Sequence, residues 1–121
     1  MPKSNVELVL DCAAPQRLEG FWRTALGYRS LVSLEDIVVL VPDNDVRSPL
    51  ILQRVPEVKN GKNRMHIDIV MEDVEAEISR LEALGARRLD DDGLRSMGSV
   101  RWVTMADPDG NEFCVSTGVQ W

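Results

Sequence analysis

Hydrophobic residues recur at helical spacing in two stretches of the chain, one in each half. In the first stretch, five side chains follow the i, i+3, i+4, i+7, i+8 spacing of a helix with one buried face: Leu18, Phe21, Trp22, Ala25 and Leu26. Pro15 suits the first turn of this helix, and Gly27 suits its C-terminal cap. The pattern predicts a core-facing helix between Pro15 and Gly27.

The second stretch has the start and stop signals of a helix as well as its spacing. Asp73 is a suitable N-cap, and Glu75 and Glu77 in the first turn interact favourably with the helix dipole. Gly85 is expected to end the helix. Its buried face is predicted from four side chains: Val74, Ile78, Leu81 and Leu84.

β-Rich runs surround the two helices in the same order in each half. A run precedes each helix, and segments 6–31 and 65–89 share this plan. The strands predicted after the helices are residues 28–33, 37–41, 50–55, 87–89, 100–105 and 112–116. Each half therefore predicts strand–helix–strand–strand–strand, which makes the fold α+β.

The length and charge of the chain narrow the function classes. Its 121 residues suit one domain, 1–121, of two modules, 1–56 and 57–121. The formal net charge of −6 argues against nucleic-acid binding, which requires a basic face. No apolar run has the length of a membrane span, and the first residues lack a signal-peptide layout. We therefore expect a cytoplasmic protein with no membrane contact.

The two cysteines and the last predicted strand bear on chemistry. Cys12 and Cys114 lie in apolar strand-like runs, which favours reduced thiols over a buried disulfide.

The turn at 107–111 leads into the last strand, where alternation places Glu112 and Cys114 on one face. Two potential metal donors therefore share one side of this strand.

Four stretches carry a resemblance to a known superfamily: FWRTALGY at 21–28, MHIDIV at 65–70, RLEALGA at 80–86 and DPDGNEFCV at 107–115. Their order and spacing resemble those of the vicinal oxygen chelate superfamily, which includes glyoxalase I, extradiol dioxygenases, fosfomycin-resistance transferases and bleomycin-resistance proteins. Residues 55–68 resemble a segment of its small glyoxalase-like domain proteins. The resemblance implies two βαβββ modules in a curved mixed sheet with a cleft, and a homodimer.

In the metal enzymes of that superfamily, the first and last strands of each module supply four ligands to one divalent cation. The matching positions are His66 and Glu7 on first strands, and Gln53 and Cys114 on last strands. Histidine is common at the position of Glu7, and glutamate is usual at the position of Cys114. The resemblance therefore assigns Glu7 and His66 to a Zn, Ni, Mn or Fe ion, within an incomplete ligand set.

Other side chains on the predicted cleft face favour a bound small molecule. Asp11 and Asp68 share the cleft side of their strands with Glu7 and His66, and buried carboxylates there require partners, a ligand or water. Trp102 faces the same way if its strand is regular, and an aromatic ring with carboxylates suits a cationic or planar molecule. The alternatives are that Trp102 belongs to the core and that His66 pairs with Asp68 or Glu7 without a metal.

The sequence leaves two function classes open. One is a protein of bleomycin-resistance type that binds a small molecule in the cleft without a complete metal site, and the incomplete ligand set favours it. The alternative is a divalent-metal-dependent lyase, isomerase or dioxygenase of vicinal oxygen chelate type, with Glu112 as the catalytic base. Cys114 is expected to be an unreactive thiol, because the chain has one histidine to activate it. The identity of the ligand and the use of a thiol cofactor are not encoded in any motif.

Overall fold

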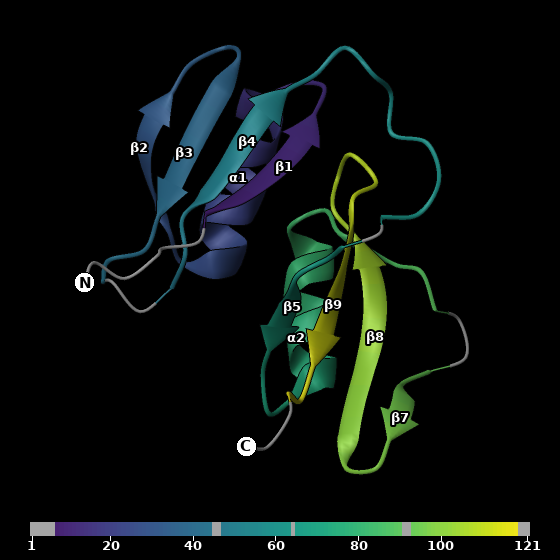
Figure 1. The fold of residues 1–121 in the computed structure, drawn as a ribbon. Helices are drawn as coiled ribbons and strands as arrows, with labels where there is room; N and C mark the ends of the chain where they lie inside the picture. Colours follow the sequence, from purple (N-terminus) through teal and green to yellow (C-terminus); the bar gives the residue numbers. More distant parts are fainter. Residues whose placement is uncertain (1–6, 45–46, 64, 91–92, 119–121) are drawn as a thin grey trace, which may run out of the picture. The chain divides into compact units, whose positions relative to one another are not determined.

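The chain forms two compact units, residues 1–59 and 60–121, each with one helix packed on one mixed sheet (Figure 1). The computed structural model describes residues 7–44, 47–63, 65–90 and 93–118. The predicted α+β class is confirmed. The division between the units follows residue 59, whereas the sequence predicts a module boundary after residue 56. That they make up a single domain stays a prediction.

The first unit contains one helix and four strands: β1 (Leu8–Cys12), α1 (Pro15–Leu26), β2 (Arg29–Ser33), β3 (Ile37–Val41) and β4 (Leu50–Arg54). The strand order is β1-β4-β3-β2, with β1 parallel to β4 and the other pairs antiparallel. α1 contacts β2, β3 and β4. Its predicted face is buried apart from Leu26, which is only half-buried.

The second unit repeats this plan with an additional strand. Its elements are β5 (Asp68–Val70), α2 (Val74–Ala83), β6 (Arg87–Arg88), β7 (Arg95–Met97), β8 (Val100–Ala106) and β9 (Glu112–Ser116). The strand order is β5-β9-β8-β6, with β7 also paired to β8 and with β5 parallel to β9. α2 contacts β6 and β9.

The additional strand, β7, is absent from the sequence prediction. β6 pairs with one end of β8, at Met105 and Ala106, and β7 pairs with the other end, from Val100 to Trp102. The two short strands therefore occupy one position in the sheet, interrupted by residues 89–94. All three residues of β7 are exposed, so the segment has no hydrophobic alternation by which to recognise it.

Both helices begin and end at the signals read from the sequence. Gly27 ends α1 with a φ of 69°, a left-handed conformation that favours glycine. Asp73 caps α2 by accepting a hydrogen bond of 3.0 Å from the backbone N–H of Ala76. Glu77, predicted as a first-turn acid, is buried and pairs with Arg80 at 2.8 Å. Neither helix of the described chain is long and apolar enough to span a bilayer.

A buried carboxylate holds the turn between β8 and β9. Asp107 is 1% exposed, and its Oδ1 accepts hydrogen bonds from the backbone N–H groups of Asp109 and Asn111, both at 2.9 Å. The side-chain amide of Asn111 donates to both carboxylate oxygens, at 3.1 and 2.9 Å. These bonds fix the geometry with which the chain enters β9, the strand that carries Glu112 and Cys114.

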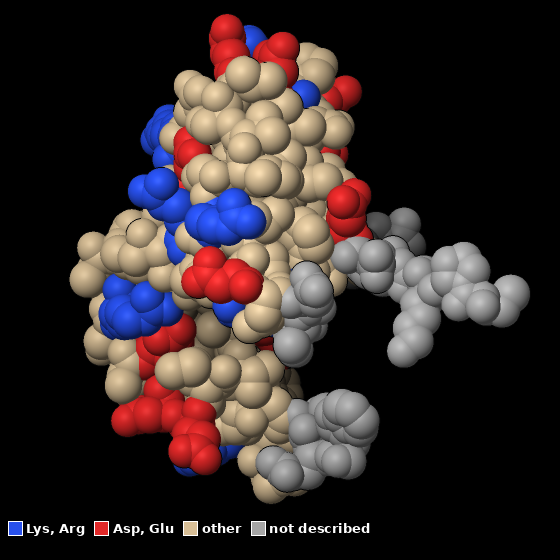
Figure 2. Space-filling view, turned by 90° about the vertical axis from the view of Figure 1, so that its left-hand side faces the viewer, with Lys and Arg blue, Asp and Glu red and all other residues tan. Residues whose placement is uncertain are grey.

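Charged side chains of both signs are interspersed on the face drawn in Figure 2. Ion pairs of the described residues include Arg54 with Glu35 at 3.2 Å and Arg88 with Glu75 at 3.7 Å. Exposed pairs of this kind contribute little to stability.

We expect Gly20→Ala to stabilise the first unit. Gly20 lies inside α1, and a Cβ added there meets no atom within 4 Å. Glycine inside a helix costs about 0.5–1 kcal/mol relative to alanine, because the glycine chain loses more freedom on folding. Urea denaturation should show the free energy of unfolding raised by this amount. Gly27→Ala is the control and should lower it, because φ at Gly27 is +69°; equal effects of the two substitutions would contradict this reading.

Candidate functional site

Three neighbouring strands of the second unit present alternate residues on the sheet face opposite α2, which we call the open face. It is formed by Asp68 and Val70 of β5, Trp102 and Thr104 of β8, and Glu112, Cys114 and Ser116 of β9. The intervening side chains are buried on the α2 side: Ile69, Val103, Met105, Phe113 and Val115. The register places Asp68 beside Cys114 and Cys114 beside Thr104. The open face therefore gathers most of the polar residues that the sequence singles out in this half.

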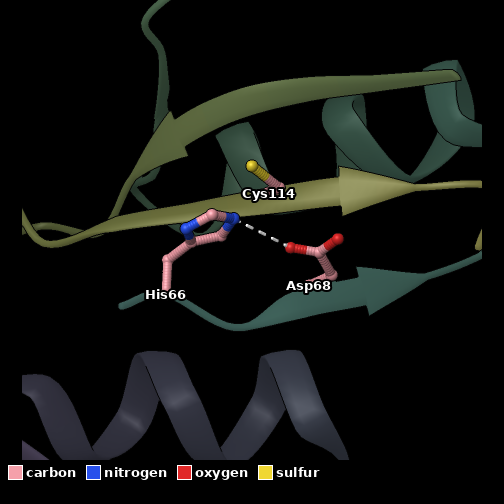
Figure 3. Close-up of side chains that lie close together, drawn as sticks. All are labelled: His66, Asp68 and Cys114. Carbon is pink, nitrogen blue, oxygen red and sulfur yellow. Dashed lines mark ion pairs between the residues drawn. The ribbon is translucent and has the colours of Figure 1, made fainter. Parts of the chain in front are cut away.

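His66, Asp68 and Cys114 meet on the open face (Figure 3). His66 lies two residues before Asp68, so both side chains project to the same side, and His66 Nε2 is 3.2 Å from Asp68 Oδ1. One donor atom from each of the three residues lies within 4.8 Å of the other two. The side chains of His66 and Asp68 are 42% and 45% exposed, whereas Cys114 is buried. The pairing of His66 with Asp68, one of the two partners considered from the sequence, is thus present.

The surroundings of Cys114 favour its protonated thiol. Burial raises the pKa of the thiol, and the negative charges of Asp68 and Asp90 raise it further. A hydrogen bond with Thr104, whose Oγ1 lies 3.7 Å from Sγ, and the positive charge of Lys62 act in the opposite direction without reversing the shift. Such a thiol is a weak nucleophile at neutral pH.

Because the fold raises the pKa of Cys114, we expect this residue to lose its stabilising contribution in alkaline solution. Above the ordinary thiol pKa of 9.0, the unfolded chain loses the thiol proton while the folded protein retains it. The contribution is therefore present below that pH and is lost as the pH rises through the folded-state pKa. Free energies of unfolding measured from neutral to alkaline pH should fall less steeply for Cys114→Ser than for the unmodified protein. Identical slopes would contradict the raised pKa.

Asp90 supports the open face from its edge, and the sequence analysis did not single it out. Its carboxylate accepts a hydrogen bond of 2.8 Å from the backbone N–H of Thr104 and pairs with Arg95 at 3.0 Å. The Asp90 carboxylate thereby supplies a hydrogen-bond acceptor to the backbone of β8 between the segments that pair with β6 and β7. A run of three aspartates at 90–92 gives no signal of which carboxylate bonds to the sheet; residues 91 and 92 lie outside the described part.

Trp102 and Glu112 lie on the open face around the cluster. Trp102 is half-buried and lies beside Ser116 in the register, which favours the open-face alternative over the core. Glu112 is also half-buried, and one oxygen of its carboxylate accepts a bond of 3.4 Å from the backbone N–H of Asn63. The side-chain amide of Asn63 donates to the Glu112 carbonyl at 3.3 Å. The segment before β5 is thus attached to the start of β9.

The remaining predicted site residues belong to the first unit. Asp11 of β1 lies beside Gln53 of β4 in the parallel register, and both are exposed. Glu7 immediately precedes β1 and is exposed as well. Alternation places Glu7 and Asp11 on the side opposite Cys12, which is buried as expected. These three polar residues form a second group on the face of the first sheet that α1 does not cover.

The fold is shared with solved structures from several organisms. The chain resembles the fosfomycin resistance protein FosX from Listeria monocytogenes, solved with Mn(II) and sulfate, at a TM-score of 0.76 and 16% identity over 98% of this chain and 93% of that chain. It resembles a glyoxalase/bleomycin resistance protein/dioxygenase family enzyme from Burkholderia phytofirmans PsJN at a TM-score of 0.72 and 12% identity, covering 91% and 94%. TioX from Micromonospora sp. ML1 matches at a TM-score of 0.66 and 16% identity, covering 97% and 100%. At such identities the likeness shows the fold.

The residues of this chain do not fit a manganese site of the kind the fold family implies. Mn(II) prefers oxygen ligands such as carboxylates and water. Where the resemblance expects a glutamate, β9 presents the Cys114 thiol, which is buried and hydrogen-bonded to Thr104. The nearest carboxylate on that strand, Glu112, is in contact with Asn63.

The match to a family model spans both units. The model of the glyoxalase-like domain matches residues 7–116, from the residue before β1 to the end of β9. No curated protein matches the chain. The matched segment includes every candidate site residue named above, and it agrees with the structural neighbours in fold. The chain therefore belongs to the glyoxalase-like domain family and has the fold of the vicinal oxygen chelate superfamily.

Proposed function

We propose that the protein binds a small planar or cationic organic molecule on the open face of the second unit, without the four-ligand manganese site of its relatives. The observation that carries this proposal is the grouping of His66, Asp68 and Cys114 within 4.8 Å. Trp102 and Glu112 lie on the same sheet face. An imidazole, carboxylates and an indole ring thus lie on the sheet face opposite α2.

The spacing of these groups suits a molecule of one aromatic ring. Asp68 lies on β5, and Trp102 lies on β8, two strands across the sheet and two residues further along it. Standard sheet geometry gives a separation of roughly 12 Å between their Cα atoms. An amidinium or amine group can donate to the half-exposed Asp68 carboxylate while the ring contacts Trp102.

A matched pair of probes tests the proposal. Benzamidine carries a planar cation on an aromatic ring, and benzoate carries an anion on the same ring. Thermal unfolding with increasing benzamidine should show a rising melting temperature, because a ligand at a hundred times its dissociation constant adds about 2.7 kcal/mol of stability. Benzoate should produce a smaller shift, since it meets the Asp68 and Glu112 carboxylates. Equal shifts, or none with benzamidine, would overturn the proposal.

Two substitutions locate the binding on the open face. Asp68→Asn removes the charge but keeps the shape, and it should weaken benzamidine binding by about tenfold, the usual scale of one charge-assisted hydrogen bond. Trp102→Phe should weaken it by a smaller factor. The matched control is Glu82→Gln, an exposed carboxylate on α2 of the same unit, which should leave the affinity unchanged.

A second candidate function is a divalent-metal-dependent lyase, isomerase or dioxygenase. What supports it is the His66, Asp68 and Cys114 group together with the Mn(II)-bound FosX neighbour. In this reading Glu112 is the general base, since its carboxylate lies on the same face. Glu112→Gln should then abolish turnover, because the amide cannot accept the proton that the carboxylate takes.

The homodimer and the cytoplasmic location expected from the sequence stay proposals. Val9 and Leu31 of the first unit are 55% and 58% exposed, and exposed apolar side chains on strands favour association. Light scattering at micromolar concentration should give twice the chain mass of 13.6 kDa. A mass of one chain would contradict the dimer.

A further inference from the structure

The three side chains at the centre of the open face supply one nitrogen, one oxygen and one sulfur donor. They come from a single pair of parallel strands and the residues just before it: Asp68 of β5, Cys114 of β9, and His66 two residues before Asp68. All three belong to the second unit. The resemblance to the superfamily assigns metal ligands from both modules and does not include Asp68.

The distances among these donors suit a shared metal ion. Zn²⁺ binds nitrogen, oxygen and sulfur ligands at about 2.0–2.3 Å, which places ligands of a tetrahedral ion roughly 3.3–3.8 Å apart. His66 Nε2 and Asp68 Oδ1 are already 3.2 Å apart. The Cys114 sulfur is within 4.8 Å of a donor atom of both, and the side chains of His66 and Asp68 are partly exposed.

The chemistry of the donor set selects the class of metal. A thiolate is a soft ligand that favours Zn²⁺ and Cd²⁺, whereas Mn²⁺ and Mg²⁺ favour oxygen. A neutral imidazole, a carboxylate and a thiolate together carry two negative charges, which balance one divalent cation. Three protein ligands are also the number typical of zinc sites that keep one position for a bound molecule.

We propose that His66 Nε2, one carboxylate oxygen of Asp68 and Cys114 Sγ form a three-ligand site for a thiophilic divalent cation of the Zn²⁺ and Cd²⁺ class, complete within the second unit. The thiol proton passes to solvent when the ion binds, and the imidazole proton resides on Nδ1. This site replaces the manganese site that the chain does not fit. It shares residues with the proposed organic-ligand site but is tested without an organic ligand.

Cobalt is the reporter for this site. Co²⁺ occupies zinc sites, and a cysteine thiolate bound to it produces a near-ultraviolet charge-transfer band that oxygen and nitrogen ligands do not produce. Titration of the full chain with Co²⁺ should develop this band to one ion per chain, and Zn²⁺ or Cd²⁺ should then remove it by displacement. Mn²⁺ and Mg²⁺ at the same concentration should leave it unchanged.

Single substitutions assign the ligands. Cys114→Ser should abolish the band, whereas Cys12→Ser, which changes the buried cysteine of the first unit, should retain it. His66→Ala and Asp68→Asn should each weaken Co²⁺ binding by at least about tenfold. Circular dichroism of each variant verifies folding. If Cys114→Ser does not fold, Cys114→Ala replaces it as the variant that lacks the sulfur ligand.

Three outcomes would overturn the site: absence of the band, its persistence in Cys114→Ser, or its removal by Cys12→Ser. An Asp68→Asn variant that binds Co²⁺ as well as the unmodified protein would remove Asp68 from the ligand set and overturn the proposal as stated. The benzamidine titration uses protein freed of metal with a chelator, so the two experiments are read separately although they share Asp68. Loss of the metal site alone leaves the binding function standing, and failure of benzamidine alone leaves the metal site standing.

Discussion

Asp107→Ala should lower the free energy of unfolding by about 3 kcal/mol, the largest single effect expected of a polar side chain here. The substitution removes the acceptor for the backbone N–H groups of Asp109 and Asn111 and for the Asn111 amide. Asn111 is buried and Asp109 half-buried, and their donors would be left without that partner. Urea denaturation followed by circular dichroism measures the loss.

Asp107→Asn is the graded control for this prediction. Asparagine retains one carbonyl oxygen for the backbone N–H groups but presents an amide to the Asn111 side chain in place of the second oxygen. Its cost should be about half that of the alanine variant. A cost of less than about 0.5 kcal/mol for Asp107→Ala would show that the turn does not depend on the buried carboxylate.

Cys114→Asp should reverse the metal preference of the second unit. The substitution replaces a soft thiolate with a hard carboxylate at the position where the superfamily commonly has glutamate. Cd²⁺ affinity should fall by at least about tenfold, and Mn²⁺ affinity should rise relative to it. Competition titrations of the two ions on the same sample measure the change in preference.

Cys114→Ser is the matched control for the aspartate variant. Serine is close to cysteine in size but supplies no charged ligand at neutral pH. It should lose Cd²⁺ binding without gaining Mn²⁺ binding. If the serine and aspartate variants behave alike, the identity of the side chain at 114 does not set the metal preference.

The sequence predicted the elements whose signals are local. The bounds of β3 and β9 agree with the prediction, and both helices end at the expected glycine or leucine–glycine pair. The face of β9 was also predicted, because alternation depends only on the strand being regular. Such features depend on periodicity and on backbone preferences within a few residues.

The features that were not predicted from the sequence depend on contacts between residues distant along the chain. The bond from Thr104 N–H to the Asp90 carboxylate joins residues fourteen apart, and nothing in the aspartate run specifies it. β7 forms because β8 offers unpaired backbone groups beyond β6, although its own residues are exposed. The inclusion of Asp68 with His66 and Cys114 likewise follows from the register of β5 on β9. The resemblance to the superfamily assigned the metal to Glu7 and His66 and did not include Asp68.

The central claim is that the open face of the second unit is the binding surface, and amide chemical shifts under benzamidine titration test it most directly. In ¹H–¹⁵N spectra of the unmodified protein, the largest shifts should fall on Asp68, Thr104 and Cys114, and on the indole N–H of Trp102. Residues on the α2 side of the same strands, such as Ile69 and Val103, should shift less. Shifts confined to the first unit, or spread evenly over both faces of the second sheet, would contradict the account.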